Sequence, residues 1–352
     1  MMKPYIVGHL VSIAGLCLLA ACAPQAPSIE MPESDLVWPE PPATPRIRFL
    51  YTLAEPEDID IRAGFFGRIM GAFRGPEARG IHSPYGLTRD AEGRLYVVDN
   101  FYQAVHVYDP GKNKYYRFPE KSPEAFRNPV DIALGSGGRI YVSDSVAGRV
   151  HVFSQQGTKY LRSIGAGQLQ RPTGLAVNHK TGELLVLDTM ASQLLVFDEG
   201  DLSLKRTVGG DNGDSGSASM FHLPTNVAVA GNGRVYVTDS MNFRIQALSA
   251  ELELTGSFGA AGNVPGNFSR PKGLATDSDG HVYVIDALFD NVQIFDDQGD
   301  LLLAFGAPGH EPGKFWLPNA IFIDPDDRIY VSDSHNKRVQ VFQYLKQAEN
   351  LQ

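Results

Sequence analysis

The sequence contains only two cysteines in 352 residues, and both, Cys17 and Cys22, lie close to its N-terminus. From residue 23 onward the chain holds no thiol, which excludes disulfide bonds, thiolate nucleophiles and zinc–thiolate centres from that part of the protein. A chain of this length buries enough apolar surface to be stable without cross-links.

Clusters of basic residues are also scarce. The formal net charge is −9, and the densest basic run is His335-Asn336-Lys337-Arg338. Proteins that bind nucleic acid usually gather Lys and Arg on one face. The charge pattern therefore argues against a nucleic-acid partner.

Only one long apolar run is present, from Tyr5 to Ala21, preceded by Lys3. The run is short for a membrane-spanning helix and ends in small residues, so it predicts a secretory signal over residues 1–21. An uncleaved anchor or an ordinary signal peptide is the alternative. Leu19-Ala20-Ala21-Cys22 resembles a bacterial lipobox, which implies that Cys22 is lipid-modified and becomes the new N-terminus.

Residues 22–45 contain the lipidated Cys and a proline-rich tether. Seven prolines between residues 24 and 45 favour extended polyproline II and oppose collapse. Position 23 is Ala, whereas an Asp at this position would resemble an inner-membrane retention signal. We therefore expect an outer-membrane anchor with the domain facing the periplasm. Trp38, the one large aromatic residue of this segment, packs either on the domain or on a partner.

The rest of the chain repeats one unit, seen clearly in Leu317–Phe342. Ala320–Ile323, Arg328–Ser332 and Arg338–Phe342 are short apolar or alternating segments separated by polar turns. Such a pattern predicts antiparallel strands joined by hairpins. One small sheet of this kind needs neighbours to cover its faces.

The unit occurs six times, each copy with a proline at the start of its first strand. These prolines are separated by 45, 43, 52, 47 and 47 residues and are Pro84, Pro129, Pro172, Pro224, Pro271 and Pro318. A four-stranded repeat of roughly 40–50 residues is typical of a β-propeller blade. We therefore predict an all-β fold, a six-bladed propeller of four-stranded antiparallel blades.

Three motifs carry a resemblance to the NHL-repeat family of propellers. They are the Pro-x-Gly-Leu-Ala opening, the Tyr-Val-x-Asp end of the second strand and the Asn-x-Arg-Val-Gln-Val-Phe third strand. The resemblance covers residues 46–345, with a non-repeat insertion at 55–80, and leaves 346–352 as a tail.

The last copy lacks a fourth strand, while the N-terminus has one to spare. Outer strands are predicted at Tyr115–Phe118, Tyr160–Ile164, Ser203–Val208, Leu252–Phe258 and Leu301–Phe305. After Phe342 no turn and strand follow. Pairing Ile47–Leu53 with Val339–Phe342 would close the ring and remove two open sheet edges.

The insertion carries an apolar stripe at helical spacing, formed by Phe65, Phe66, Ile69, Met70 and Phe73. One interpretation is a short helix packed on the propeller. The other is a contact site for a partner or a membrane.

Ligands of propellers usually bind where the inner strands converge at the mouth of the central channel. The two positions after each repeat proline should lie there, and they supply the candidate ligand-binding residues Tyr85, Asp131, Asn226, Lys272 and Asn319. A ring with one acid, one base, two amides and a phenol suits a small polar ligand or a peptide end. Alternatively, these residues only hydrogen-bond to each other and to channel water.

The sequence lacks the residue patterns of two enzyme classes that have related propellers. The resemblance implies that the family's peptide-amidating lyases bind zinc through a His directly after the repeat proline. No copy in this chain has His at that position. His82 and His222 lie two residues before a repeat proline. Calcium-dependent lactonases use a Glu with Asn and Asp residues, and no Glu falls in this ring. No metal site or catalytic residue is assigned.

An Asp ends the second strand of every copy, at positions 99, 144, 188, 239, 286 and 333. Because it recurs six times, we predict a structural role, capping the turn and pairing with Arg149, Arg244 or Arg338.

These observations predict a monomeric, lipid-anchored propeller that faces the periplasm and serves as a binding or assembly platform for an envelope protein or polysaccharide. It would need no cofactor. The alternative is a divalent-metal-dependent hydrolase or lyase, similar to lactonases, acting at the channel mouth with Ca²⁺ as a possible ion.

Overall fold

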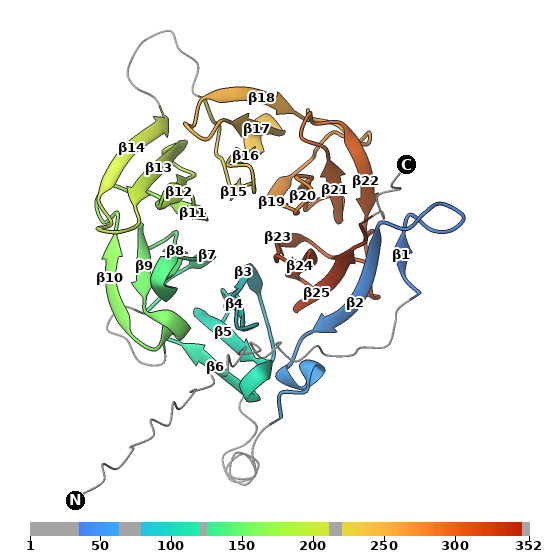
Figure 1. The fold of residues 1–352 in the computed structure, drawn as a ribbon, viewed down its shortest axis with the longest axis horizontal. Helices are drawn as coiled ribbons and strands as arrows, with labels where there is room; N and C mark the ends of the chain where they lie inside the picture. The colour runs from blue at the N-terminus through green and yellow to red at the C-terminus, as the bar shows by residue number, and fades with distance from the viewer. Residues whose placement is uncertain (1–34, 63–78, 120–124, 211–219, 347–352) are drawn as a thin grey trace, which may run out of the picture.

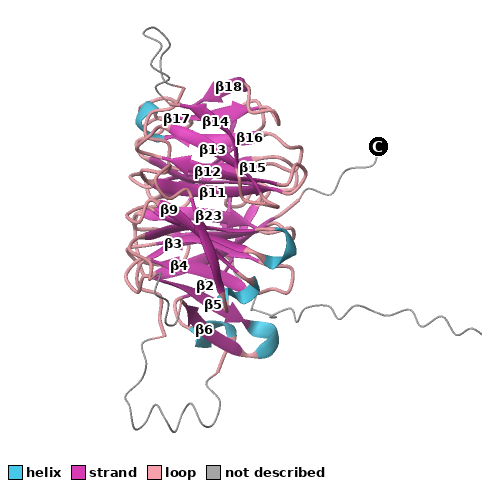
Figure 2. Ribbon diagram, turned by 90° about the vertical axis from the view of Figure 1, so that its left-hand side faces the viewer, coloured by secondary structure: helices cyan, strands magenta, loops and turns pink. Residues whose placement is uncertain are grey.

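The computed structural model describes residues 35–62, 79–119, 125–210 and 220–346. Within these ranges, six antiparallel sheets are arranged as a ring around a central axis (Figure 1). Seen from the side, the ring is a flat disc with turns and connectors on both faces (Figure 2). The predicted six-bladed β-propeller is confirmed.

In blades one to five, the four strands are connected by hairpins and run from the channel outward in chain order. Blades one to three consist of β3 (Pro84–Arg89), β4 (Leu95–Asp99), β5 (Ala104–Asp109) and β6 (Lys114–Phe118); β7 (Pro129–Leu134), β8 (Ile140–Asp144), β9 (Arg149–Phe153) and β10 (Tyr160–Ile164); and β11 (Pro172–Asn178), β12 (Glu183–Asp188), β13 (Gln193–Asp198) and β14 (Leu204–Gly209).

Blades four to six follow the same order. They consist of β15 (Asn226–Val229), β16 (Val235–Asp239), β17 (Arg244–Leu248) and β18 (Leu254–Phe258); β19 (Pro271–Thr276), β20 (Val282–Asp286), β21 (Asn291–Phe295) and β22 (Leu301–Phe305); and β23 (Pro318–Ile323), β24 (Arg328–Asp333) and β25 (Arg338–Tyr344). Short 3-10 turns are η1 (Pro56–Ile59), η2 (Pro110–Lys112), η3 (Ser136–Gly138), η4 (Gln155–Gly157) and η5 (Ser240–Asn242).

The ring closes between the two ends of the chain. Strand β2 (Ile47–Leu53) is the outer strand of blade six and pairs antiparallel with β25, from Ile47 opposite Tyr344 to Leu53 opposite Val339. The predicted closure is confirmed, and β25 extends two residues beyond the predicted strand end. Pairing removes the open edge that each strand would otherwise present.

A fifth strand, β1 (Val37–Trp38), lies outside β2 in the same sheet. The indole of Trp38 contacts the rings of Phe305 and Phe342, each with centroids 5.8 Å apart. The described end of the proline-rich segment therefore packs on the propeller, which answers for Trp38 the question that the sequence left open.

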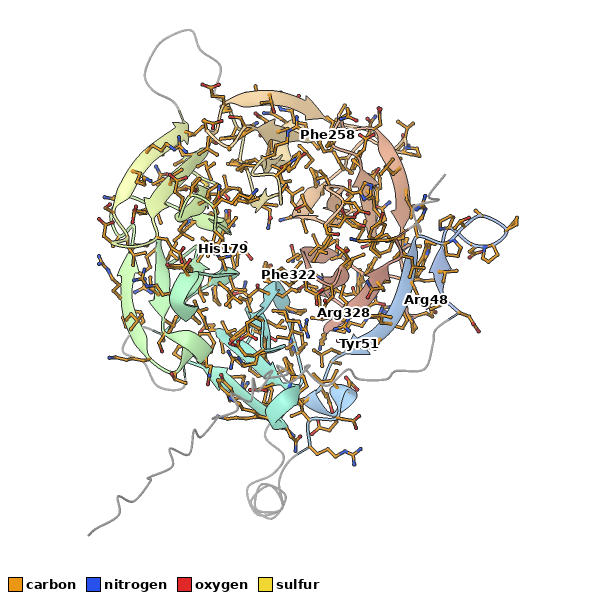
Figure 3. All side chains as sticks on the ribbon, viewed as in Figure 1. Arg48, Tyr51, His179, Phe258, Phe322 and Arg328 are labelled. Carbon is orange, nitrogen blue, oxygen red and sulfur yellow. The ribbon has the colours of Figure 1, made fainter. Side chains whose placement is uncertain are left out.

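The hydrophobic core lies between neighbouring sheets. One cluster joins Val98 of blade one to Ile132 and Val142 of blade two, and equivalent clusters fill the other blade boundaries. Tyr51 and Phe322 pack against the cluster between blades six and one, and Phe258 against the one between blades four and five (Figure 3). Each blade thus covers the face of the next, as the small size of a single sheet requires.

In the described ranges, no helix is long and apolar enough to cross a bilayer. The signal residues, Cys22 and the candidate contact residues Phe65, Phe66, Ile69, Met70 and Phe73 lie outside the described ranges.

Candidate functional site: the channel mouth

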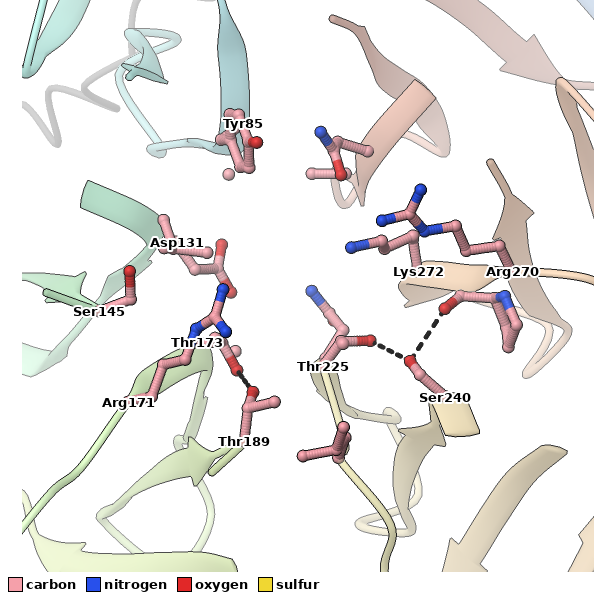
Figure 4. A pocket seen from close by; sticks show the side chains of 18 of the residues that line it. Tyr85, Asp131, Ser145, Arg171, Thr173, Thr189, Thr225, Ser240, Arg270 and Lys272 are labelled. Carbon is pink, nitrogen blue, oxygen red and sulfur yellow. Dashed lines mark hydrogen bonds between the residues drawn. The ribbon is translucent and has the colours of Figure 1, made fainter. Parts of the chain in front are cut away.

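The ring encloses a cavity of about 440 Å³ at one end of the channel (Figure 4). The five candidate residues predicted from the repeats all line it: Tyr85, Asp131, Asn226, Lys272 and Asn319. They come from the starts of inner strands of five different blades. The structure therefore brings together residues that are more than 230 positions apart in the sequence.

In blades one, three and five, the second position after the repeat proline is glycine: Gly86, Gly174 and Gly273. A Cβ atom added at Gly86 would lie 2.5 Å from the Cα of Asp131, and one added at Gly174 would lie 2.7 Å from the Cα of Asn226. In these blades the next inner strand approaches so closely that a Cβ atom would clash with its backbone. This packing explains the Pro-x-Gly element of the repeat.

Hydroxyl groups join consecutive blades around the mouth. Thr189 Oγ1 donates to the carbonyl of Pro224 at 2.7 Å, Ser240 Oγ to that of Pro271 at 3.0 Å, and Ser334 Oγ to that of Pro84 at 2.6 Å. Each donor follows the Asp at the end of a second strand, and each acceptor is a repeat proline of the next blade. These polar groups of the mouth are thus used within the protein.

The repeated Asp is structural, as its recurrence predicted. Asp144 is fully buried and accepts hydrogen bonds from the backbone N–H groups of Arg127, Asn128 and Ala147. Although burial alone would raise it, the adjacent imidazole of His151, with Nε2 3.6 Å from Asp144 Oδ2, and the hydrogen bonds from these N–H groups lower the pKa of Asp144 to about 2. The carboxylate ties the turn to the connector that enters the inner strand.

Two of the predicted arginine partners form ion pairs with the repeated Asp. Arg244 Nε lies 2.9 Å from Asp239 Oδ2, and Arg338 Nε lies 2.7 Å from Asp333 Oδ2. Arg149 Nε donates to the carbonyl of Ala147. The pairing is therefore confirmed in blades four and six.

Asp131 spans the boundary between blades two and three. Its Oδ2 accepts from the N–H of Leu175 and its Oδ1 from the N–H of Ile132, both at 2.9 Å. Burial raises the pKa of Asp131 to about 6, although both hydrogen bonds act in the opposite direction. Both carboxylate oxygens already accept hydrogen bonds, so Asp131 holds the two inner strands of the channel wall together.

The uncharged candidates Asn319, Tyr85 and Asn226 differ in their hydrogen bonds. Asn319 Nδ2 donates to Ser334 Oγ at 3.3 Å, so its amide belongs to the hydroxyl network. Within the described ranges, the side chains of Tyr85 and Asn226 make no hydrogen bond to the protein, and no hydrogen bond joins any two of the five candidates. Mutual hydrogen bonding therefore does not explain this ring.

Three cationic side chains line the same cavity: Lys272, Arg171 and Arg270 (Figure 4). Among the described residues, none of the three side chains has a hydrogen-bonded or ion-paired partner. Burial, with the like charges of Arg270 and Arg171 nearby, lowers the pKa of Lys272 to about 8. The mouth of a protein with net charge −9 is thus locally positive.

Arg171 and Arg270 were missed as site residues in the sequence. Both stand directly before a repeat proline, a position that the other copies fill with Ser83, Asn128, Leu223 and Leu317. Comparing this position across the copies would have revealed two basic residues where small, amide or apolar ones occur elsewhere. The repeat register alone did not place that position at the mouth.

The described residues form no cluster that resembles a metal site. Among the described residues, no three His, Cys, Asp or Glu side chains come together to hold an ion. His82 stacks on Phe101, with ring centroids 3.8 Å apart, and neither His82 nor His222 lines the cavity.

Comparison with known proteins agrees with the architecture. The sequence model of the NHL repeat matches residues 126–153 and 315–342, two of the six repeats proposed here. No curated protein matches the chain. The protein is a six-bladed β-propeller that carries NHL repeats.

Many solved structures share this fold. They include virginiamycin B lyase from Staphylococcus aureus (12% identity, 75% of this chain and 95% of that chain covered, TM-score 0.55). An auxiliary nutrient binding protein from Bacteroides thetaiotaomicron is also similar (15%, 76% and 71%, 0.60). So is regucalcin, a calcium-binding protein from Agrobacterium tumefaciens (12%, 84% and 94%, 0.56). At such low identity the likeness shows the fold alone.

Proposed function

We propose that this protein is a lipid-anchored propeller of the cell envelope that faces the periplasm and holds a partner through an anionic group at its channel mouth. The partner would be an envelope protein or polymer. The anchor and the location rest on the leader, the lipobox-like Leu19-Ala20-Ala21-Cys22 and the proline-rich segment. The function would be binding and assembly.

The observation that carries the proposal is the set of unpaired cations. Lys272, Arg171 and Arg270 line one cavity without carboxylate partners among the described residues, whereas the hydroxyls beside them are bonded to neighbouring blades. Like charges held together in a partly buried site raise its free energy, and an anion relieves this cost. Two guanidinium groups also suit carboxylate or phosphate oxygens, which they bind in bidentate fashion.

A divalent metal fits this cavity poorly. Its lining has one carboxylate, that of Asp131, and both oxygens of that carboxylate accept backbone N–H groups. Calcium prefers six to eight oxygen ligands, several of them carboxylates, and three nearby cations oppose it. We therefore assign no hydrolase or lyase chemistry to the cavity.

Titration calorimetry with citrate as the probe tests the anion site. The wild-type protein should bind citrate, and the triple variant Arg171→Gln/Arg270→Gln/Lys272→Gln should bind at least about tenfold more weakly. A matched control, Lys112→Gln/Lys159→Gln/Arg162→Gln, removes the same charge from outer strands and turns and should bind like wild type. Equal weakening in both triple variants would reduce the effect to net charge and refute a site.

The anchor has its own test. Cys22→Ser should move the protein from the membrane fraction to the soluble fraction of the envelope, whereas Cys17→Ser should leave it in the membrane fraction. If Cys22→Ser stays in the membrane fraction, the lipid-anchor proposal is wrong.

A further inference from the structure

Five exposed apolar side chains recur at one position of the repeat. Each stands two residues after the Asp that ends a second strand, and each is 48–63% exposed; they are Phe101, Val146, Met190, Met241 and Leu288. We call this set the apolar ring. The sixth blade has His335 at the same position, in contact with the half-exposed indole of Trp316.

The register places the apolar ring on the face that carries the cavity. Pro84 pairs with Asp99, Pro129 with Asp144 and Pro271 with Asp286, so the turn after each Asp lies beside the start of an inner strand. Ser145, Thr189 and Ser240, one residue before members of the ring, line the cavity, and so does Met241 itself. Apolar side chains therefore surround a positive centre.

The recurrence is not expected of a solvent-facing turn. Such turns usually carry Gly, Asn, Asp or Ser, because these residues suit the backbone and remain hydrated. Of the twelve exposed large apolar residues in the described ranges, five occupy this one position. Single exposed apolar residues are normal, but apolar residues gathered on one face indicate an interaction surface.

The composition of the face selects its occupant. Val, Met and Leu side chains offer no hydrogen bond to a sugar, and thioethers adapt their shape to apolar partners. A protein segment can place one carboxylate among Lys272, Arg171 and Arg270 and lay apolar side chains on the ring.

We propose that the channel-mouth face docks an acidic–apolar protein segment, with a Glu, Asp or C-terminal carboxylate in the cavity and apolar residues on the apolar ring. This inference rests on the proposed anion site and specifies its partner as a protein. Phe101 is already held in place for such a contact by its stacking on His82, with ring planes 11° apart. An ordered aromatic anchor loses little conformational freedom on binding.

The test is a selection of random dodecapeptides displayed on phage against the purified full-length protein. Enriched peptides should combine a carboxylate with apolar residues. In fluorescence polarisation, the selected peptides should bind the ring variant Phe101→Ser/Met190→Ser/Leu288→Ser at least about tenfold more weakly than wild type. Replacing the peptide carboxylate by an amide should weaken binding by a similar factor.

A matched control is Leu161→Ser/Leu254→Ser/Leu302→Ser, which removes three comparably exposed apolar side chains from the outer strands β10, β18 and β22. It should bind the peptides like wild type. The ring variant should also keep its citrate affinity, which separates this inference from the anion site. Loss of citrate binding only in the cationic triple variant, with peptides unaffected by the ring variant, would leave the anion site standing and overturn the docking face.

Two other outcomes would also overturn the inference. One is a selection that enriches no peptide, or only peptides without acidic groups. The other is binding to phosphatidylglycerol vesicles that the ring variant loses and the outer-strand control keeps, which would assign the face to a lipid surface instead.

Discussion

The N–H of Leu175 donates to Oδ2 of Asp131 across the boundary between blades two and three, at 2.9 Å. A raised pKa of about 6 accompanies this contact, because burial disfavours the charged form. Between its ordinary pKa and about pH 6, the carboxyl keeps its proton in the folded protein but loses it in the unfolded chain. The folded state then binds more protons, so this group lowers stability as the pH rises through that range.

We expect Asp131→Asn to unmask this effect. At pH 4.5 the variant and the wild type should have free energies of unfolding within about 1 kcal/mol of each other, since both present an uncharged group. At pH 8 the variant should gain on the order of 1–3 kcal/mol relative to wild type. Denaturant unfolding at both pH values measures the difference.

Asp144→Asn is the control of opposite sign. Its hydrogen bonds hold the pKa of Asp144 at about 2, so both states of the wild type are ionised at pH 4.5 and at pH 8. The variant should be destabilised by a similar amount at the two pH values. A pH-independent difference for Asp131→Asn as well would contradict the assigned shift.

The buried ion pair of blade six should contribute much more than an exposed one. Arg338 Nε donates to Asp333 at 2.7 Å, and its other nitrogens donate to the carbonyls of His310, Glu311 and Lys314. Asp333→Ala leaves a buried cation without its carboxylate and should cost about 3–5 kcal/mol in chemical unfolding. Glu311→Ala, which breaks the exposed pair with Lys314, should cost less than about 1 kcal/mol. Similar losses of unfolding free energy in both variants would show that the buried pair contributes no more than the exposed one.

The hydroxyl network between blades predicts a loss in Thr189→Val. This change keeps the shape of the side chain but leaves the Pro224 carbonyl and Thr173 Oγ1 without their partner. We expect a loss of about 1–3 kcal/mol in the free energy of unfolding. Thr207→Val, on the exposed outer strand β14, should be neutral or slightly stabilising. A neutral Thr189→Val would mean that water replaces the bond at no cost.

Anion binding at the mouth should weaken at alkaline pH. The pKa of Lys272 is lowered to about 8, so raising the pH from 7 to 9 neutralises it in the free protein. Citrate affinity should fall about fivefold to tenfold over this range, as one charged hydrogen-bond donor is lost. Lys272→Arg, whose guanidinium stays protonated, should flatten the profile. A fall of equal size in Lys272→Arg would assign the pH dependence to another group.

The architecture could be predicted from the sequence, because the pattern of each blade is local and is repeated. Alternating strands such as Arg338–Phe342, their turns and the recurring proline and Asp specify hairpins over short distances. Ring closure could also be predicted from the sequence, since an outer strand is missing at one end of the chain and a spare strand is present at the other. Pairing the two removes both open sheet edges. The register of β2 on β25 follows that logic.

Which side chains remain available at the mouth depends on contacts that form when the chain folds. The repeat pattern predicted the same ligand-binding role for Asp131, Asn319 and Lys272. In the structure, Asp131 accepts hydrogen bonds from backbone N–H groups and Asn319 donates to Ser334, whereas Lys272 makes neither kind of contact. Arg171 and Arg270 became part of the site because closure of the ring carries residues before two prolines to the same cavity. Such convergence depends on contacts between blades far apart in the chain, which local periodicity does not encode.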